Sequence, residues 1–286
     1  MHSIVLTKGV PDFREGQVSF NEEGHLERGK TPTVMNPNDK FALEAAMQTK
    51  VRHGGRVSVM SMGPPGYQGI LVEAMRDVYA DDLYLLSDRE MAASDTWATA
   101  ITLSAGIEKL GEPDLIFAGF KTADGETGHT GPQTAWCLDW PMITHVVALD
   151  VDEDEGRVRA KRLVEGDIKE IETVEVDLPA FIVMDPEFEP SYRRAEHRLV
   201  FKDLREETQA RAEAAENAEN AITVWDHVAL NLDPNFIGLD GSPTIVSSVD
   251  PIPKAPAERE ATMVEATDAE GMKEVLDVMD AFAAGD

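Results

Sequence analysis

Short apolar segments alternate with longer helical patterns along most of this chain. The apolar segments are four to six residues long, and loops rich in glycine, proline or aspartate follow them. Strands buried on both faces of a parallel sheet have this composition, and a helix usually connects one such strand to the next. The alternation therefore predicts an α/β fold, a Rossmann-like parallel sheet with helices on both faces. The expected strands are residues 3–6, 56–61, 82–86, 114–118 and 180–184, and the expected helices lie within 36–53, 70–75 and 96–110.

The pattern changes in the second half of the chain. Residues 144–151, 157–163 and 170–176 alternate polar with apolar side chains, which predicts a small antiparallel meander with one solvent-exposed face. Residues 231–256 hold many proline, glycine, serine and aspartate residues and too few clustered apolar ones for a core, so they are either disordered or an extended arm. Residues 267–282 form an amphipathic helical pattern. We therefore expect an α/β nucleotide-binding domain at 1–230 and a C-terminal arm and helix at 231–286.

The loop from Gly119 to Pro132 is the strongest functional signal. It follows the expected strand 114–118 and leads into a helix-like segment, and it is rich in glycine and threonine. Glycines let the backbone approach an anion, threonines offer hydroxyl donors, and a helix start offers unpaired N–H groups. The loops after Leu6 and Ser61 should lie at the same sheet edge, where ligands of such sheets bind. The sequence thus predicts a nucleotide-type ligand, and an ordinary strand-to-helix turn is the alternative.

The charge balance narrows the possible partners. The chain has 54 acidic and 26 basic residues, a formal net charge of −28. Such a chain repels the phosphates of nucleic acids and anionic membranes, so neither is expected as a direct partner. Because the acidic residues are dispersed, they indicate either general solubility or adaptation to a high-salt cytoplasm, where salt screens their repulsion. The sequence has no signal-peptide pattern and no apolar stretch of membrane-spanning length, which predicts a cytoplasmic protein.

Several catalytic signatures are missing from the sequence. There is no Gly-x-Gly-x-x-Gly after the first strand, no His-Glu-x-x-His and no Gly-x-Ser-x-Gly. Without an evident acid/base pair, nucleophile or metal cluster, we expect no catalytic or metal-binding residues and a binding role instead.

The chain resembles the beta subunit of the electron transfer flavoproteins over nearly its whole length. The segments that carry the resemblance are Leu6–Pro11, Met35–Pro37, Ser61–Pro64, Gly119 with Ala123–Thr127, Gly131–Pro132, Leu138–Pro141, Leu178–Ala180 and Val249–Pro251.

The resemblance implies an adenine-nucleotide-hydrolase type of Rossmann-like fold and a heterodimer with an alpha subunit that binds the electron-carrying FAD. It implies an electron carrier, not an enzyme, that passes electrons from dehydrogenases to a quinone oxidoreductase. The beta subunit of this family holds AMP, or a second FAD in the electron-bifurcating branch. The C-terminal arm would contact the alpha subunit. The acidic composition would place this member in a halophile.

The pocket that the resemblance implies involves three separate parts of the chain. Two positions depart from the family, which often has Gln at position 129 and Asp at position 126. The alternatives are a nucleotide-sensing protein of the same fold without a redox role, and an enzyme that hydrolyses or transfers adenylate. The implied cofactor-binding residues are Leu6, Asn36, Pro37, Asn38, Asp39, Met62, Ala123, Asp124, Gly125, Glu126, Thr127, Gly128, His129, Thr130, Gly131 and Pro132.

Overall fold

The computed structural model describes residues 1–12, 32–78, 80–164, 166, 168–188, 222–245 and 267–284. The chain divides into two compact units, Met1–Ser248 and Val249–Asp286. The first unit contains the sheet and its covering helices, and the second contains one described helix.

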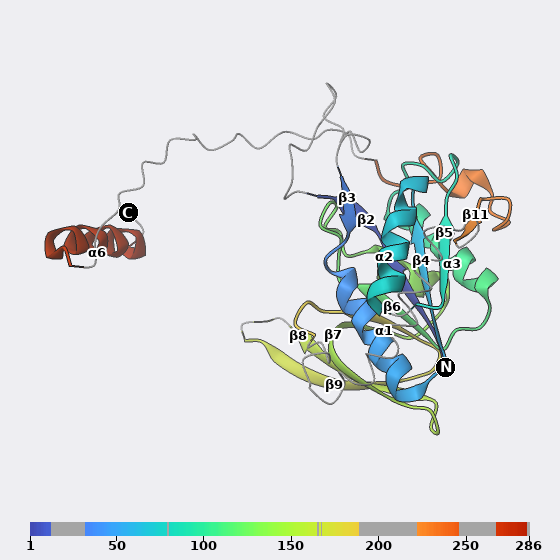
Figure 1. Ribbon diagram of the computed structural model, residues 1–286, viewed down its shortest axis with the longest axis horizontal. Coiled ribbons are helices and arrows are strands. Elements are labelled where there is room, and N and C mark those ends of the chain that lie inside the picture. Colours follow the sequence, from blue (N-terminus) through green and yellow to red (C-terminus); the bar gives the residue numbers. More distant parts are fainter. Residues whose placement is uncertain are drawn as a thin grey trace. The chain divides into compact units, whose positions relative to one another are not determined.

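A nine-stranded sheet forms the centre of the first unit (Figure 1). The strand order is β11-β5-β4-β1-β6-β10-β7-β8-β9, and all neighbours from β11 to β7 are parallel. The predicted parallel α/β sheet is therefore confirmed. The strands are β1 (His2–Thr7), β4 (Arg56–Met62), β5 (Asp82–Leu86), β6 (Leu115–Gly119), β7 (Met142–Asp152), β8 (Arg157–Val164), β9 (Glu170–Asp177), β10 (Ala180–Met184) and β11 (Thr223–Trp225), with β2 (Gly9–Pro11) and β3 (Thr33–Met35) as a separate antiparallel pair.

Helices cover both faces of the parallel part. Helices α1 (Asp39–His53) and α2 (Gln68–Val78) lie on one face, and α3 (Thr96–Leu110) and α4 (Thr130–Cys137) lie on the other. Successive side chains of a strand point to opposite faces. Accordingly Val5 of β1 packs into the core under α1 and α2, whereas Ile4 and Leu6 pack into the core under α3 and α4. Short 3-10 turns, η2 (Pro65–Tyr67) and η4 (Pro234–Phe236), complete the unit.

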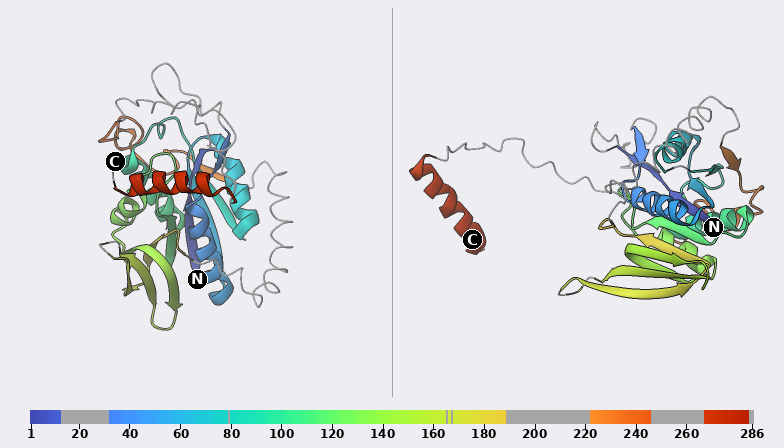
Figure 2. Two further views of the ribbon diagram at one scale, coloured as in Figure 1. Left: turned by 90° about the vertical axis from the view of Figure 1, so that its left-hand side faces the viewer. Right: turned by 60° about the horizontal axis from the view of Figure 1, so that its bottom comes forward.

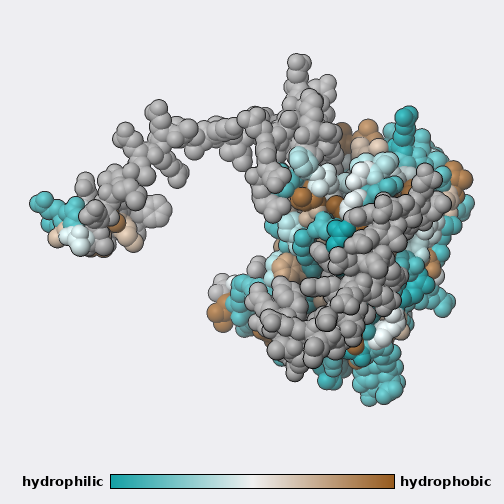
Figure 3. Space-filling model, viewed as in Figure 1, coloured by the Kyte–Doolittle hydropathy of each residue, from teal (hydrophilic) through white to brown (hydrophobic). Residues whose placement is uncertain are grey.

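The predicted meander is present as β7, β8 and β9, which extend the sheet beyond β10 (yellow-green in Figure 2). Its buried side chains, such as Val158 and Ala160, join the core on the α1 side. The opposite face carries cross-strand ion pairs, including Arg159 Nε to Glu175 Oε1 at 2.6 Å and Arg157 Nε to Asp177 Oδ1 at 3.0 Å. In the face shown in Figure 3, hydrophilic residues dominate the coloured surface and hydrophobic ones are scattered.

Residues 222–245 differ from the extended arm that the sequence suggested from position 231 onward. Strand β11 pairs with β5, and Ile237 is 1% exposed in the core under α3 and α4. The carboxylate of Asp95 caps α3 by accepting from two backbone N–H groups, and it also accepts from Thr244 N at 3.0 Å and Thr244 Oγ1 at 2.6 Å. Isolated apolar residues thus fill a core that other elements supply. Contact of the residues after 248 with a partner stays a prediction.

The described helix of the second unit is α6 (Ala269–Ala284), close to the predicted range 267–282. Its apolar stripe includes Met272, Val275, Leu276 and Met279, which are between 39% and 62% exposed. Among the residues that the structure describes, none of the helices has the length and apolar character needed to cross a membrane.

Candidate functional site

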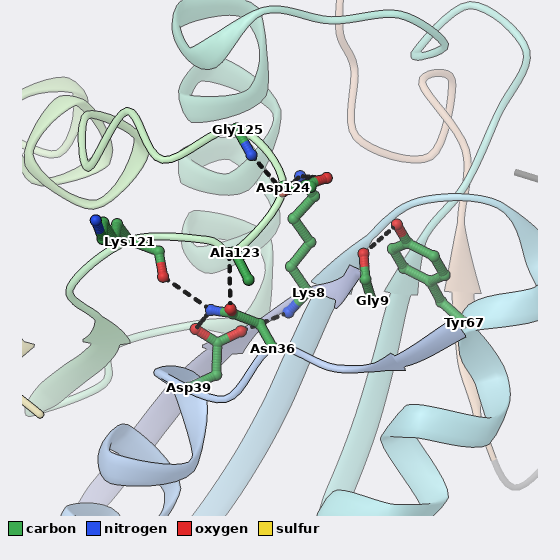
Figure 4. Close-up of polar contacts among 9 residues, drawn as sticks. All are labelled: Lys8, Gly9, Asn36, Asp39, Tyr67, Lys121, Ala123, Asp124 and Gly125. Carbon is green, nitrogen blue, oxygen red and sulfur yellow. Dashed lines mark hydrogen bonds and ion pairs between the residues drawn. The ribbon is translucent and has the colours of Figure 1, made fainter. Parts of the chain in front are cut away.

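The candidate site lies at the carboxyl ends of β1, β4 and β6. The chain goes from β1 to β4 and β5 on one side, and β6 lies on the other side of β1, so β1 and β6 flank the topological switch point. The loops after these strands contact one another, as the sequence predicted. Lys8 Nζ reaches Asp124 across this point, and Tyr67 Oη donates to Gly9 O at 2.6 Å (Figure 4). Switch points of this kind are where open α/β sheets bind ligands.

Asn36 joins the loop after β1 to the loop after β6. Its Nδ2 donates to Lys121 O at 3.0 Å and to Asp39 Oδ1 at 2.7 Å, and its Oδ1 accepts from Ala123 N at 3.1 Å. The side chain is fully buried. Asn36 followed by Pro37 is typical of a helix start and predicts a cap at Asn36, but this prediction is wrong: residues 37 and 38 form a turn, and α1 begins at Asp39. The side-chain amide of Asn36 instead bonds to the loop after β6. Its partner Lys121 lies 85 positions away in the sequence, so no local pattern reveals the contact.

Asp39 is a buried carboxylate directly behind this amide. Its two oxygens accept from Asn36 Nδ2 and from Lys8 N, the latter at 2.8 Å. Burial raises the pKa of Asp39 to about 7, against the lowering effect of these two hydrogen bonds. Through these two hydrogen bonds Asp39 holds the loop after β1 in place beside the amide of Asn36.

Gly119 is required by the close approach of β6 to the turn before α1. A Cβ built on Gly119 would overlap Asp39 Oδ1 and lie 2.7 Å from Asn38 C and 2.8 Å from Asn38 O. No side chain fits between the end of β6 and this turn without moving backbone. The absence of a Cβ lets the two loops share the hydrogen bonds made by Asn36.

Lys8 and Asp124 form the charged centre of the site. Lys8 Nζ lies 2.8 Å from Asp124 Oδ1 and 2.7 Å from Asp124 Oδ2. The two side chains are 34% and 11% exposed, respectively. Burial by itself raises the pKa of Asp124, but the charge of Lys8 and hydrogen bonds from Lys8, Thr122 and Gly125 N outweigh it, and the pKa stays below its usual range. The carboxylate is therefore ionised at neutral pH.

The rest of the loop leads into the first turn of α4. Glu126 has a φ of 51° and Gly128 a φ of 66°, so the backbone turns back twice before the helix begins at Thr130. Residues 125–127 and His129 are exposed. A helix start beside a loop of exposed residues is typical of an anion-binding arrangement.

The structure brings some of the implied pocket residues together and separates others. The loop 123–130, Asn36, Asn38 and Asp39 are contiguous through the hydrogen bonds above, and Asn38 Nδ2 also donates to Lys121 O at 2.8 Å. Leu6 and Met62 pack into the core under α3 and α4, and Pro37 is exposed. A Cβ on Gly131 would face Val183 Cγ2 at 3.4 Å, toward the strands. Whether each residue binds the ligand stays a prediction.

The cofactor-binding residues implied by the sequence did not include Lys8, Gly119 or Tyr67. Lys8 offered a signal, because it is a cation directly after the first strand of a strongly acidic chain. Gly119 opens the glycine-rich loop that the sequence singled out, but its contact with the turn before α1, like the bond of Tyr67 to Gly9, could not be predicted from local sequence.

Three buried polar atoms near this edge have no hydrogen-bond partner among the described residues: Thr7 Oγ1, Ser61 Oγ and Gln133 Oε1. Thr7 and Ser61 face each other in register at the carboxyl ends of β1 and β4, and Gln133 lies in the first turn of α4. Buried polar groups are normally paired, so unpaired ones at a candidate site indicate a ligand or water. Hydroxyls, an amide oxygen, an ammonium and loop N–H groups together fit a nucleotide.

One cleft lies away from this site, and one sequence motif lies outside the described residues. A cleft of about 670 Å³, lined by residues that include Glu108, Asp114 and Trp140, lies at the amino ends of β6 and β10, the opposite edge of the sheet. The letters from Gly24 to Thr31 match the P-loop spacing, although they lie outside the described residues. A P-loop opens a helix, whereas Pro32 and strand β3 follow here, so the match lacks the required context.

Comparison with known proteins gives consistent matches over most of the chain. The model of the electron transfer flavoprotein domain matches residues 24–227. "Protein FixA" of Azotobacter vinelandii is 37% identical over 275 residues, 94% of this chain and 90% of that protein. "Caffeyl-CoA reductase-Etf complex subunit CarD" of Acetobacterium woodii is 35% identical over 248 residues, and "Electron transfer flavoprotein subunit beta" of Clostridium acetobutylicum is 36% identical over 247, each covering 86% of both chains.

Proposed function

This chain belongs to the electron transfer flavoprotein family, as a beta-type subunit with an electron transfer role in a flavoprotein complex, and from that premise we propose that its own site binds an adenine nucleotide. The ligand is AMP, or a second FAD bound through its AMP half. The supporting observation is the join between the loops after β1 and β6, where Lys8, the loop 123–130 and the start of α4 gather cationic and N–H donors.

The residues of the site divide into two groups by what they offer. The hydroxyls of Thr127 and Thr130 and the ammonium of Lys8 can hold phosphate oxygens, and so can Gly125 N once it leaves Asp124. Asn36 and Asp39 are buried behind them and fix the loops that present these donors. Bound FAD would supply the redox chemistry itself, because its ring system takes up and releases electrons, while the protein supplies binding and orientation.

We also propose that the chain works with an alpha-type subunit that binds the electron-carrying FAD. The names of the relatives support this, since one is a subunit of a caffeyl-CoA reductase-Etf complex and one an electron transfer flavoprotein beta subunit. Dehydrogenases or reductases are then the proposed electron-exchange partners, with a quinone oxidoreductase as a further acceptor and electron bifurcation as one mode of action. The residues after 248 are the proposed contact with the alpha subunit, because the stripe of α6 is exposed within its own unit.

The dispersed acidic charge supports one more part of the proposal, adaptation to a high-salt cytoplasm. A net charge of −28 costs stability through self-repulsion unless dissolved salt screens it. The salt dependence of unfolding tests this part separately.

The nucleotide proposal is tested by co-producing this chain with the alpha-type subunit of the same organism. The purified complex is denatured, and FAD and AMP are quantified per heterodimer. One FAD with one AMP, or two FAD, supports the proposal and identifies the ligand. A single FAD without any second adenine nucleotide contradicts it. The variant Asn36→Ala should lose the second nucleotide but keep the FAD of the alpha subunit, which serves as the internal control.

A further inference from the structure

The carboxylate of Asp124 binds the kinds of donor that a phosphate would bind. It receives the ammonium of Lys8 on both oxygens, at 2.8 and 2.7 Å, and Gly125 N on Oδ1 at 2.8 Å. The hydroxyl of Thr122 also bonds to it. An ammonium, a loop N–H and a threonine hydroxyl are the groups that Gly-rich loops use to hold phosphate oxygens.

Hydrogen bonds fix the backbone of Lys8, so only its side chain can exchange one partner for another. Its backbone N–H donates to Asp39 Oδ2 at 2.8 Å, and its carbonyl accepts from Asn36 N at 2.9 Å. The stem therefore starts from a fixed point on the loop after β1. The ammonium crosses the switch point to Asp124, with Lys8 about one third exposed and Asp124 more deeply buried (Figure 4). The cation lies at the rim, where an anion from solvent can reach it.

A phosphate and this carboxylate compete for the same donors. Both are anions, and two like charges a few Å apart repel each other strongly in a partly buried site. A doubly charged phosphate attracts the ammonium more strongly than a single carboxylate does. The phosphate and the Asp124 carboxylate cannot both bind Lys8 and Gly125 N, so one of them must leave these donors. Asp124 belongs to a loop whose outer residues are exposed.

We propose that Asp124 is an internal competitor for the nucleotide phosphate: it holds Lys8 Nζ and Gly125 N in the free protein, and the phosphate takes over these donors on binding. This inference rests on the proposed nucleotide-binding function and assigns the residue that sets the affinity for the phosphate group. Asp124 thereby selects ligands with enough negative charge to displace it. A nucleoside without phosphate gains nothing from the exchange, so the site discriminates between adenosine and AMP.

The test measures the dissociation constants of AMP and of adenosine for the full-length chain by isothermal titration calorimetry. Asp124→Asn should bind AMP about tenfold more tightly, since a charge-assisted bond that competes for Lys8 is removed, while adenosine binding is unaffected. Glu126→Gln is the matched comparison. It removes one negative charge from the same loop, from a side chain that is 63% exposed and lies 3.4 Å from Lys121, and so measures the general charge effect.

The variant Lys8→Met provides a second test, which does not depend on the folding of the Asp124 variant. If the phosphate takes over Lys8, this variant should lose about tenfold in AMP affinity and keep its adenosine affinity. If the ratio of AMP affinity to adenosine affinity is the same in Lys8→Met as in the wild type, the proposal is overturned. So does an Asp124→Asn variant that binds AMP no more tightly than Glu126→Gln, which would mean that Asp124 positions Lys8 instead of competing with the ligand. A wild-type chain that binds neither AMP nor adenosine defeats the nucleotide function itself, and the inference with it.

Discussion

Substituting Gly119 by alanine should destabilise the first unit by opening the join between β6 and the turn before α1. The added Cβ overlaps Asp39 Oδ1 and comes within 2.8 Å of backbone atoms of Asn38. Backbone and a buried carboxylate cannot step aside as the end of a flexible side chain can. The turn must therefore shift, and the hydrogen bonds that Asn36 and Asp39 make to both loops weaken with it.

The expected size follows from two opposing terms. Overpacking of this kind typically costs about 1–3 kcal/mol, and contact with backbone places Gly119→Ala near the upper end. Replacing glycine by alanine also restricts the unfolded chain and returns roughly 0.5 kcal/mol. The net loss is about 2 kcal/mol in the free energy of unfolding, which corresponds to a fall in Tm of roughly 4–8 °C for a unit of this size.

The assay is urea unfolding of the full-length variants, followed by circular dichroism and by tryptophan fluorescence. Gly125→Ala is the matched control, because its Cβ would meet nothing closer than Thr122 Oγ1 at 3.7 Å. It should match the wild type or be slightly more stable. The reasoning is refuted if Gly119→Ala unfolds at the same urea concentration as Gly125→Ala, since the two loops would then not be packed as described.

Three further outcomes follow from the structure. Because the pKa of Asp39 is raised to about 7 in the folded protein, from 3.8 in the unfolded chain, the folded state binds more protons between these values. The contribution of Asp39 to stability should thus fall by about 3 kcal/mol as the pH rises from 4 to 7, and the stability difference between wild type and Asp39→Asn should track this when urea unfolding is repeated across that range. The Tm of the full chain should rise with potassium chloride well into the molar range, because salt screens the dispersed carboxylates; a flat or falling Tm would contradict salt adaptation. Truncation after Ser248 should leave the far-ultraviolet circular dichroism and Tm of the first unit intact but weaken co-purification with the alpha subunit, whereas truncation after Asn231 should also lower the Tm, because it removes the buried Ile237.

Local patterns in the sequence were sufficient for most of the secondary structure. Strands β5 and β10 and helix α3 have the predicted bounds, because continuous apolar runs and well-spaced alanine-rich segments leave few alternatives. The loop after β6 was also visible, since glycines and threonines between a buried strand and a helix are a local signal. Alternation in residues 144–176 likewise predicted the meander, because one side of those strands faces water.

The tertiary structure alone decided which residues of different loops touch. Asn36 looked like a helix cap because the local sequence offers that role, but burial against the loop after β6 uses its amide instead. The assignment of residues 231–245 to the first unit also depended on distant partners, since the segment has no core of its own and is held by Ser94, by Asp95 and by the core under α3 and α4. Apolar periodicity and turn residues act over a few positions of the chain, so a single sequence determines elements and loops. The pairing of Lys8 with Asp124 joins positions 116 residues apart, and it is set by strand order, which the sequence pattern did not determine.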